Sequence, residues 1–147
     1  MIKPLMGTVV GKQTNNRAEL TAILKCIERT LPLHRPLHIF TDSQYSLQAI
    51  SKFCRLSMEE FMEAVNYDKV LNLDIISTIV EGIRHHQPHK VFISKVAGHS
   101  GIIGNEIADQ LSKRARLAII DEEKRNALNR ASAVKSLERF FWSRKLE

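Results

Sequence analysis

The sequence predicts a single α/β domain with parallel strands at its centre. Three short runs of apolar and β-branched residues read as strands, and the segments between them carry apolar residues at helical spacing. Strands that alternate with helices in this way are typical of α/β domains, in which the strands run parallel. The length of 147 residues fits one domain, and an apolar content of 44% is sufficient for a hydrophobic core.

The N-terminal third is predicted to form a strand, a helix and a second strand. The first strand is expected from Leu5 to Lys12, because this stretch contains a short β-branched run. The helix that follows would take Asn15 or Asn16 as its N-cap. Its apolar positions recur at helical spacing: Leu20, Ile23, Leu24 and Ile27. Beyond a proline-bounded loop, Leu37 to Thr41 is predicted as a compact buried strand.

The remaining chain continues the alternation of helices and strands. Gln44 to Phe53 is predicted as a helix, and Met58 to Val65 as a helical turn or two. Leu71 to Ile83 has the apolar periodicity of an amphipathic helix. Val91 to Val96 is predicted as the last strand, and a glycine-rich loop then leads to a helix from about Asn105.

Cysteine content and hydropathy bear on the compartment. Cys26 and Cys54 are the only cysteines, which does not suggest a disulfide framework, and Cys26 is predicted to lie in the core. No apolar run reaches the roughly 18–20 residues that a membrane span needs, and the N-terminus is too weakly apolar for a signal peptide. We therefore predict an intracellular protein, cytoplasmic or nuclear, without a membrane partner.

The net charge of +6 is concentrated near the C-terminus. Residues 1–112 hold 12 lysines and arginines against 11 acidic residues, whereas residues 113–147 hold 10 against 5. A basic segment on a nearly neutral body favours a polyanionic partner, most often nucleic acid. A solvated helix with a basic face is the alternative interpretation.

The chain is predicted to divide into a domain of residues 1–118 and a basic amphipathic helical extension of residues 119–147. Several apolar residues of the extension are predicted to share one helical face: Leu128, Ala131, Val134, Leu137 and Phe141. Such a face needs to be buried. Packing on the chain's own domain would bury it, and so would an interface with a second subunit or another partner.

Three acidic residues stand in separate polar motifs. Glu19 lies in the motif of residues 14–20, Asp42 follows the strand at 37–41, and Asp109 ends the motif of residues 98–109. Carboxylates bind hard cations such as Mg²⁺ and Mn²⁺, and they rarely share a site without a metal. Because open α/β sheets place their sites at the carboxyl ends of strands, we expect the three carboxylates to converge at one edge of the sheet.

In this order and at these separations, the motifs resemble ribonuclease H, type 1, including the copies attached to reverse transcriptases. The resemblance runs from about Gly7 to Arg116. It implies an RNase H-like mixed sheet flanked by helices. It also implies Mg²⁺- or Mn²⁺-dependent endonucleolytic hydrolysis of the RNA strand of RNA–DNA hybrids, with two metal ions roughly 4 Å apart.

The same resemblance implies roles for individual residues. Glu19, Asp42 and Asp109 match metal-binding carboxylates, and His99 matches a mobile histidine that assists proton transfer or product release. Further positions match substrate contacts: Asn15, Asn16, Ser43, Gln44, Tyr45 and Asn105. Amides suit contacts with 2′-hydroxyls because they both donate and accept hydrogen bonds. The asparagines equally suit helix caps, and the serine and the tyrosine equally suit structural positions.

One departure from the family concerns its first strand, which carries a further catalytic Asp. This chain has no Asp or Glu before Glu19, and the family has two more strands ahead of the run at Leu5 to Lys12. Three explanations are open. The chain is a truncated product; or the strand from Leu5 to Lys12 takes the central position, or a second copy fills it by exchange in a homodimer; or another polypeptide supplies the strand with its Asp.

A second departure lies at residues 53–70, where many relatives carry a basic, Trp-containing protrusion. This stretch holds four acidic residues against two basic ones, so the protrusion is predicted to be absent or altered. The basic tail after Lys113 would then substitute as an electrostatic anchor. The three histidines at residues 85, 86 and 89 are predicted to form a loop and not a metal site, because Pro88 interrupts any regular ligand face.

Three functions follow from these features. The first is a hybrid-cleaving nuclease whose activity is impaired or depends on a completing strand. The second is a catalytically inactive module that binds nucleic acid or a protein. The third is an assembly protein whose tail mediates dimerisation and whose sheet is completed by a partner.

Overall fold

The structure is a computed structural model that describes residues 6–12, 14–66 and 70–144. Side chains of the last helix are described as far as Ala133, and also for Lys135. The chain forms two compact units: residues 9–106 make one, and residues 107–147 together with residues 1–8 make the other. Each unit is described by itself below.

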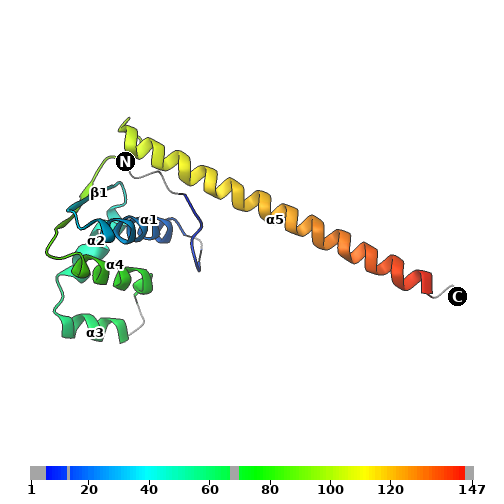
Figure 1. The fold of residues 1–147 in the computed structure, drawn as a ribbon, viewed down its shortest axis with the longest axis horizontal. Coiled ribbons are helices and arrows are strands. Elements are labelled where there is room, and N and C mark those ends of the chain that lie inside the picture. Colours follow the sequence, from blue (N-terminus) through cyan, green and yellow to red (C-terminus); the bar gives the residue numbers. More distant parts are fainter. Residues whose placement is uncertain (1–5, 13, 67–69, 145–147) are drawn as a thin grey trace. The chain divides into compact units, whose positions relative to one another are not determined.

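Helices and strands alternate as the sequence predicts. In chain order the elements are α1 (Asn15–Thr30), a short 3₁₀ helix (Leu31–Leu33), β1 (Leu37–Thr41), α2 (Gln44–Cys54), α3 (Met58–Asn66), α4 (Leu73–His85), β2 (Val91–Lys95) and α5 (Ile103–Arg144) (Figure 1). Over the described residues, five α-helices and a small parallel sheet confirm the α/β prediction.

The sheet pairs β1 with β2 in parallel, in register from Leu37 opposite Val91 to Thr41 opposite Lys95. The backbone N–H of Leu37 donates to the Lys90 carbonyl at 3.0 Å, and the N–H of Val96 donates to the Thr41 carbonyl at 2.9 Å. Backbone groups of alternate residues point to opposite edges of a strand, so those of His38 and Phe40 point away from β2. No other described strand pairs with that edge of β1.

The core lies on one face of this sheet, between it and the helices α1, α2 and α4 (Figure 1). Ile39 of β1 joins a buried cluster from these helices and α3 that includes Leu20, Ile27, Ile50, Phe61, Ile76, Ile79 and Val80. The opposite face of the sheet carries aromatic side chains in the open: Phe40 is 61% exposed and Phe92 is 52% exposed. The ring of His38 stacks on that of Phe40.

The strand predicted from Leu5 to Lys12 is wrong for residues 6–12, which are not strand, while Leu5 lies outside the described residues. The β-branched run finds no described strand to pair with, and Val10 is 83% exposed. Strand structure requires hydrogen bonds to a neighbour, so β-branched composition alone cannot produce it. Gly11, at φ +89°, turns the backbone after this run.

Two smaller predictions for α1 are also wrong. The cap of the helix is Thr14 and not an asparagine: its hydroxyl accepts a hydrogen bond from the Arg17 N–H at 3.3 Å. Asn15 and Asn16 are instead the first two helical residues. Cys26 is exposed, because the buried stripe of α1 runs through Leu20, Ile23 and Ile27 and leaves residue 26 outside it.

A network around Arg17 joins the segment before α1 to the start of α4. The guanidinium forms a forked pair with the Asp74 carboxylate, at 3.0 and 2.6 Å, and also donates to the Val10 carbonyl at 2.7 Å. This hydrogen-bonded pairing lowers the pKa of Asp74 below its ordinary value and raises that of Arg17. The network therefore anchors a stretch of chain that has no regular structure of its own.

The helix α5 differs from all the others in length and exposure. It runs unbroken for 42 residues, and none of its described side chains is buried. Leu128, predicted to lie on an apolar face, is 71% exposed, while the side chains of Val134, Leu137 and Phe141 lie outside the described part. The predicted domain boundary at 118/119 falls inside this helix and stays a prediction. No described helix is long and apolar enough to cross a membrane.

Candidate active site

Asp42 is positioned by the end of β1. It follows Thr41 directly, at the carboxyl edge of the parallel pair, which is the edge where α/β sheets bind ligands. The Thr41 side chain is buried, and its hydroxyl accepts a hydrogen bond from the Ser43 N–H at 3.1 Å. The chain is thus held on both sides of Asp42, whose side chain is half-buried.

Two distant segments reach the Asp42 carboxylate. The Asn105 amide donates a hydrogen bond to Oδ2 of Asp42 at 3.2 Å. A Cβ atom added to Gly98 would lie 3.1 Å from the same oxygen, so the loop after β2 passes close against the carboxylate, and a side chain there would require the carboxylate to shift. Asn105 was expected to cap a helix or to contact substrate. In the structure it is the third residue of α5 and orients the carboxylate.

The loop between β2 and α5 holds His99 in an unusual backbone conformation. His99 has φ +53° and Gly101 has φ +75°. The left-handed conformation costs a non-glycine residue about 1–3 kcal/mol, whereas glycine adopts it freely. The Ser100 hydroxyl donates to the Ala97 carbonyl at 2.6 Å and so closes the turn. The side chain of His99 is exposed on this loop.

His99 has an acidic neighbour that the sequence motifs did not single out. A ring nitrogen of His99 and a carboxylate oxygen of Glu106 lie within 4.8 Å of one another. Glu106 is half-buried in the first turn of α5, directly after Asn105. The sequence signal that could have identified Glu106 as a site residue was its position inside the motif of residues 98–109. The sequence alone does not show which side of the helix faces the loop.

The start of α2 provides a second cluster of polar groups near the end of the sheet. Ser43 is the N-cap of α2, and its hydroxyl accepts from the Ser46 N–H at 3.1 Å. Gln44 is exposed, and its Oε1 accepts from the Lys95 ammonium at 2.8 Å. Lys95 ends β2 and was not predicted as a site residue. It places a positive charge at the same edge of the sheet as Asp42.

Tyr45, one residue further into α2, has structural partners. Its hydroxyl donates to the Leu71 carbonyl at 3.3 Å and accepts from the Asn72 amide at 3.1 Å. Asn72 precedes α4 in a left-handed conformation, at φ +60°. Tyr45 therefore fastens α2 to the turn that begins α4.

The residues predicted on α1 lie in its first two turns. Asn15 and Asn16 are exposed, and Glu19 is half-buried one turn further along. Their amide and carboxylate groups are presented by a rigid helix whose start is fixed by Thr14 and Arg17.

Asp109 belongs to the other compact unit, that of residues 107–147. It lies on α5 four residues after Asn105, and residues four apart share one face of a helix. Its side chain is half-buried.

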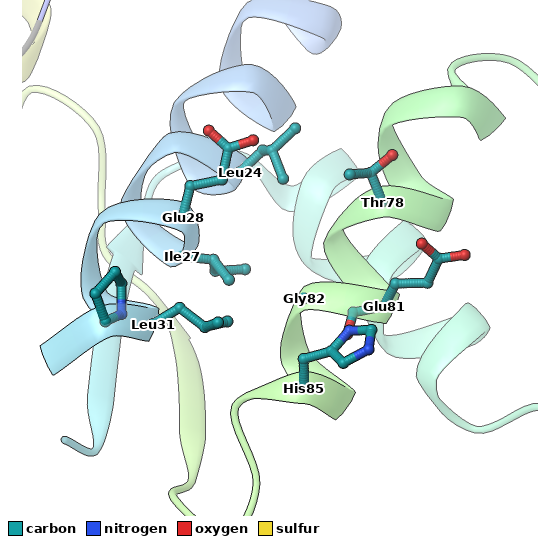
Figure 2. A pocket seen from close by; sticks show the side chains of 9 residues that line it. Leu24, Ile27, Glu28, Leu31, Thr78, Glu81, Gly82 and His85 are labelled. Atoms are coloured by element: carbon teal, nitrogen blue, oxygen red, sulfur yellow. The ribbon is translucent and has the colours of Figure 1, made fainter. Parts of the chain in front are cut away.

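A separate pocket of about 340 Å³ lies between α1 and α4 (Figure 2). Ile27 of α1 and Leu31 of the 3₁₀ helix that follows face Gly82 of α4, with the carboxyl groups of Glu28 and Glu81 at the sides. No predicted site residue lines this pocket.

Two of the three clustered histidines form hydrogen bonds within the fold, and His85 is the last residue of α4 and not part of the predicted loop. Buried His86 shares a hydrogen bond of 2.6 Å between its Nε2 and the Arg35 carbonyl, and His85 Nδ1 lies 2.8 Å from the Glu81 carbonyl. His86 therefore ties the end of α4 to the loop before β1.

Comparison with known proteins places these features in a family. The model of the RNase H family matches residues 3–116. A ribonuclease H of Orientia tsutsugamushi is 36% identical over 113 residues, which are 77% of this chain and 65% of that protein. A ribonuclease H of Ruthia magnifica is 34% identical over 113 residues, or 77% and 75% of the two chains. One of Schizosaccharomyces pombe is 34% identical over 111 residues, or 76% and 39%.

Proposed function

Because this chain belongs to the RNase H family, we propose that it hydrolyses the RNA strand of RNA–DNA hybrids endonucleolytically. The observation that carries the proposal is the arrangement around Asp42. Its carboxylate is held at the end of β1 by Asn105, against the loop that presents His99. The chain spans 65% of the length of the Orientia relative, and the activity is therefore proposed for the site.

The donor set fits divalent cations that prefer oxygen ligands. Glu19, Asp42 and Asp109 would supply the carboxylates, and Mg²⁺ or Mn²⁺ would contribute Lewis-acid activation of water and stabilisation of the leaving oxygen in a two-metal reaction. Asn105 donates its hydrogen bond to Oδ2 of Asp42. This hydrogen bond fixes the orientation of the whole carboxylate, including Oδ1. Asn105 thus acts as a positioning residue for a metal-binding carboxylate.

Other residues of the chain would move protons and hold the substrate. His99, exposed on a glycine-containing turn, would carry a proton to or from the reacting phosphate, and Glu106 beside it would orient the ring. Asn15 and Asn16 would contact the minor groove of the hybrid through their amides, and Gln44 would do so through its NH₂ group, because its Oε1 accepts a hydrogen bond from Lys95. Ser43, Tyr45 and Asn105 were predicted as contacts too, and their intramolecular hydrogen bonds favour a supporting role.

A fourth carboxylate would come from a strand added to the free edge of β1. The chain has no Asp or Glu before Glu19, and the edge of β1 that points away from β2 is open over the described residues. Phe40 lies on β1 itself and is 61% exposed, so it offers apolar surface beside the open edge. We propose that full activity requires an added strand that pairs with β1 and brings an Asp next to Asp42.

The test is cleavage of an end-labelled RNA–DNA hybrid in Mg²⁺ or Mn²⁺, with an Asp42→Asn variant as control. The experiment uses the chain alone and a fusion that carries the first strands of the Orientia ribonuclease H at its N-terminus. We expect the fusion to cut at least 100-fold faster than the chain alone, and Asp42→Asn to abolish cutting in both. Metal-independent cutting, or cutting that survives Asp42→Asn, would contradict the proposal.

The second candidate function is a catalytically inactive module that binds nucleic acid or dimerises. The observation that favours it is the exposure of Phe40, Phe92 and Leu128. Retained hybrid binding without cleavage by the fusion would establish it. Light scattering at micromolar concentration distinguishes dimerisation from nucleic-acid binding. A monomer would exclude the assembly function.

A further inference from the structure

The helix α5 repeats a pair of basic residues at a spacing of eleven. Lys113 and Arg114 are followed by Lys124 and Arg125, and Lys135 stands eleven residues after Lys124. All five side chains are exposed, and all five residues lie on the uninterrupted part of the helix. We call these five residues the basic stripe.

Helix geometry brings these residues onto one side. Eleven residues at 3.6 per turn return to within about 20° of the starting direction, and they advance about 16.5 Å along the axis. The three lysines therefore form one row of roughly 33 Å, and the two arginines form a second row beside it.

The rest of the helix surface is balanced in charge. Between residues 113 and 135, Asp121 is the acidic residue that falls within the stripe, which leaves it with a net charge of +4. The two remaining cations, Arg116 and Arg130, lie about 140° away on average and are matched by Glu122 and Glu123. The positive charge of this segment is thus concentrated on one side of the helix and not spread evenly around it.

The apolar residues of the same segment argue against a membrane or a partner helix. Leu117 and Leu128 lie inside the basic stripe and Ile120 lies beside it, whereas Ile119 lies on the far side. The described side chains of residues 113–135 therefore form no apolar face separate from the cations that could enter a lipid surface. The two leucines are eleven residues apart, which is too sparse for a coiled-coil seam with its mean spacing of about 3.5 residues.

A row of exposed cations fits the phosphate backbone of a nucleic acid, which presents negative charge continuously along its length. We propose that the basic stripe of α5 is a docking surface for the phosphate backbone of a nucleic acid, separate from the Asp42 site. Lysine and arginine side chains make such contacts through charge and hydrogen bonding, without a requirement for base sequence. The surface would lengthen the footprint of the chain on its substrate whether or not the Asp42 site is active.

Two double variants with equal charge test the proposal on the full chain. Arg114→Gln with Arg125→Gln removes two cations from the stripe. Arg116→Gln with Arg130→Gln removes two exposed arginines of the same helix from outside it. Circular dichroism first establishes equal helix content. Fluorescence anisotropy then measures binding of a labelled RNA–DNA hybrid over a range of salt concentrations, in the Asp42→Asn background so that the hybrid stays intact.

Log affinity falls linearly with log salt concentration. We expect the stripe variant to make this slope shallower by about two units, and the control variant to change it by less than about half a unit. Equal losses in both variants would overturn the proposal, because general charge would then explain the binding. Unchanged slopes in both would overturn it too. Binding of the unmodified chain to phosphatidylserine vesicles that is lost in the stripe variant, with hybrid binding retained, would assign the surface to lipid instead.

The outcome is independent of catalysis. If the cleavage test fails, the salt slopes of the two variants still test the docking surface. If the two slopes are equal, the proposal of metal-dependent cleavage at the Asp42 site is not affected.

Discussion

The helices α4 and α5 show two ways in which a sequence can order one side of a helix. In the 13 residues of α4, apolar side chains recur along one face, and five of the thirteen residues are buried. In α5, apolar residues are scattered around the helix axis and none of the described side chains is buried. The residues that share one side of this helix are the cations of the basic stripe. Packing therefore stabilises α4, whereas the described part of α5 has no buried side chain that could contribute in the same way.

The largest expected effect tests this difference in burial. Ile79→Ala removes a fully buried side chain of α4 and should lower the free energy of unfolding by about 3 kcal/mol, since the cavity adds to the lost transfer energy. Leu128→Ala, at a side chain that is 71% exposed on α5, should change it by less than about 0.5 kcal/mol. Urea denaturation measures both. Similar losses would mean that Leu128 is buried in solution by a second copy or another part of the chain.

The next effect is on the site. Gly98→Ala places a Cβ atom 3.1 Å from Oδ2 of Asp42 and should displace the carboxylate, lowering the cleavage rate of the strand-completed fusion by about tenfold. Gly104→Ala is the matched control, because an added Cβ there meets nothing within 4 Å. Mn²⁺ titration by calorimetry gives a second readout, in which we expect weaker binding for Gly98→Ala alone. Equal rates and equal affinities in the two variants would show that the loop yields without moving Asp42.

The smallest effect concerns the ion pair that anchors the start of α4. Pairing with Arg17 lowers the pKa of Asp74, so the pair contributes stability above the ordinary pKa of 3.8, and that contribution is lost as the pH falls through the lowered value. The Asp74 side chain is 63% exposed, which limits the contribution at neutral pH to under about 1 kcal/mol. Asp74→Asn should therefore destabilise the protein at pH 7, and the difference from wild type should shrink as the pH falls from 3.8 to 2.

Urea denaturation at both pH values measures this difference. Asp121→Asn on α5 serves as a control that should have no effect at either pH. A difference for Asp74→Asn that persists at pH 2 would assign the stabilisation to neutral hydrogen bonds instead of charge.

The helices and the two strands of the sheet could be read from the sequence because their signals are local. Helical hydrogen bonds join residues four apart, so periodicity located α2, α3 and α4 to within two residues at each end, and the strand at Leu37 to Thr41 was correct. The family, too, was recognisable from the motifs around three carboxylates, and comparison with known proteins confirms it.

Tertiary structure decided the features that depend on residues distant in the chain. Residues 6–12 have strand composition but no described strand partner, so they form none. Asn105, 63 residues from Asp42, orients its carboxylate, and Lys95 reaches Gln44 across 51 residues. Sequence by itself determined the family to which the chain belongs and where most of its helices run. The partners of each side chain follow only from packing, because contacts between distant residues depend on where the whole chain places them.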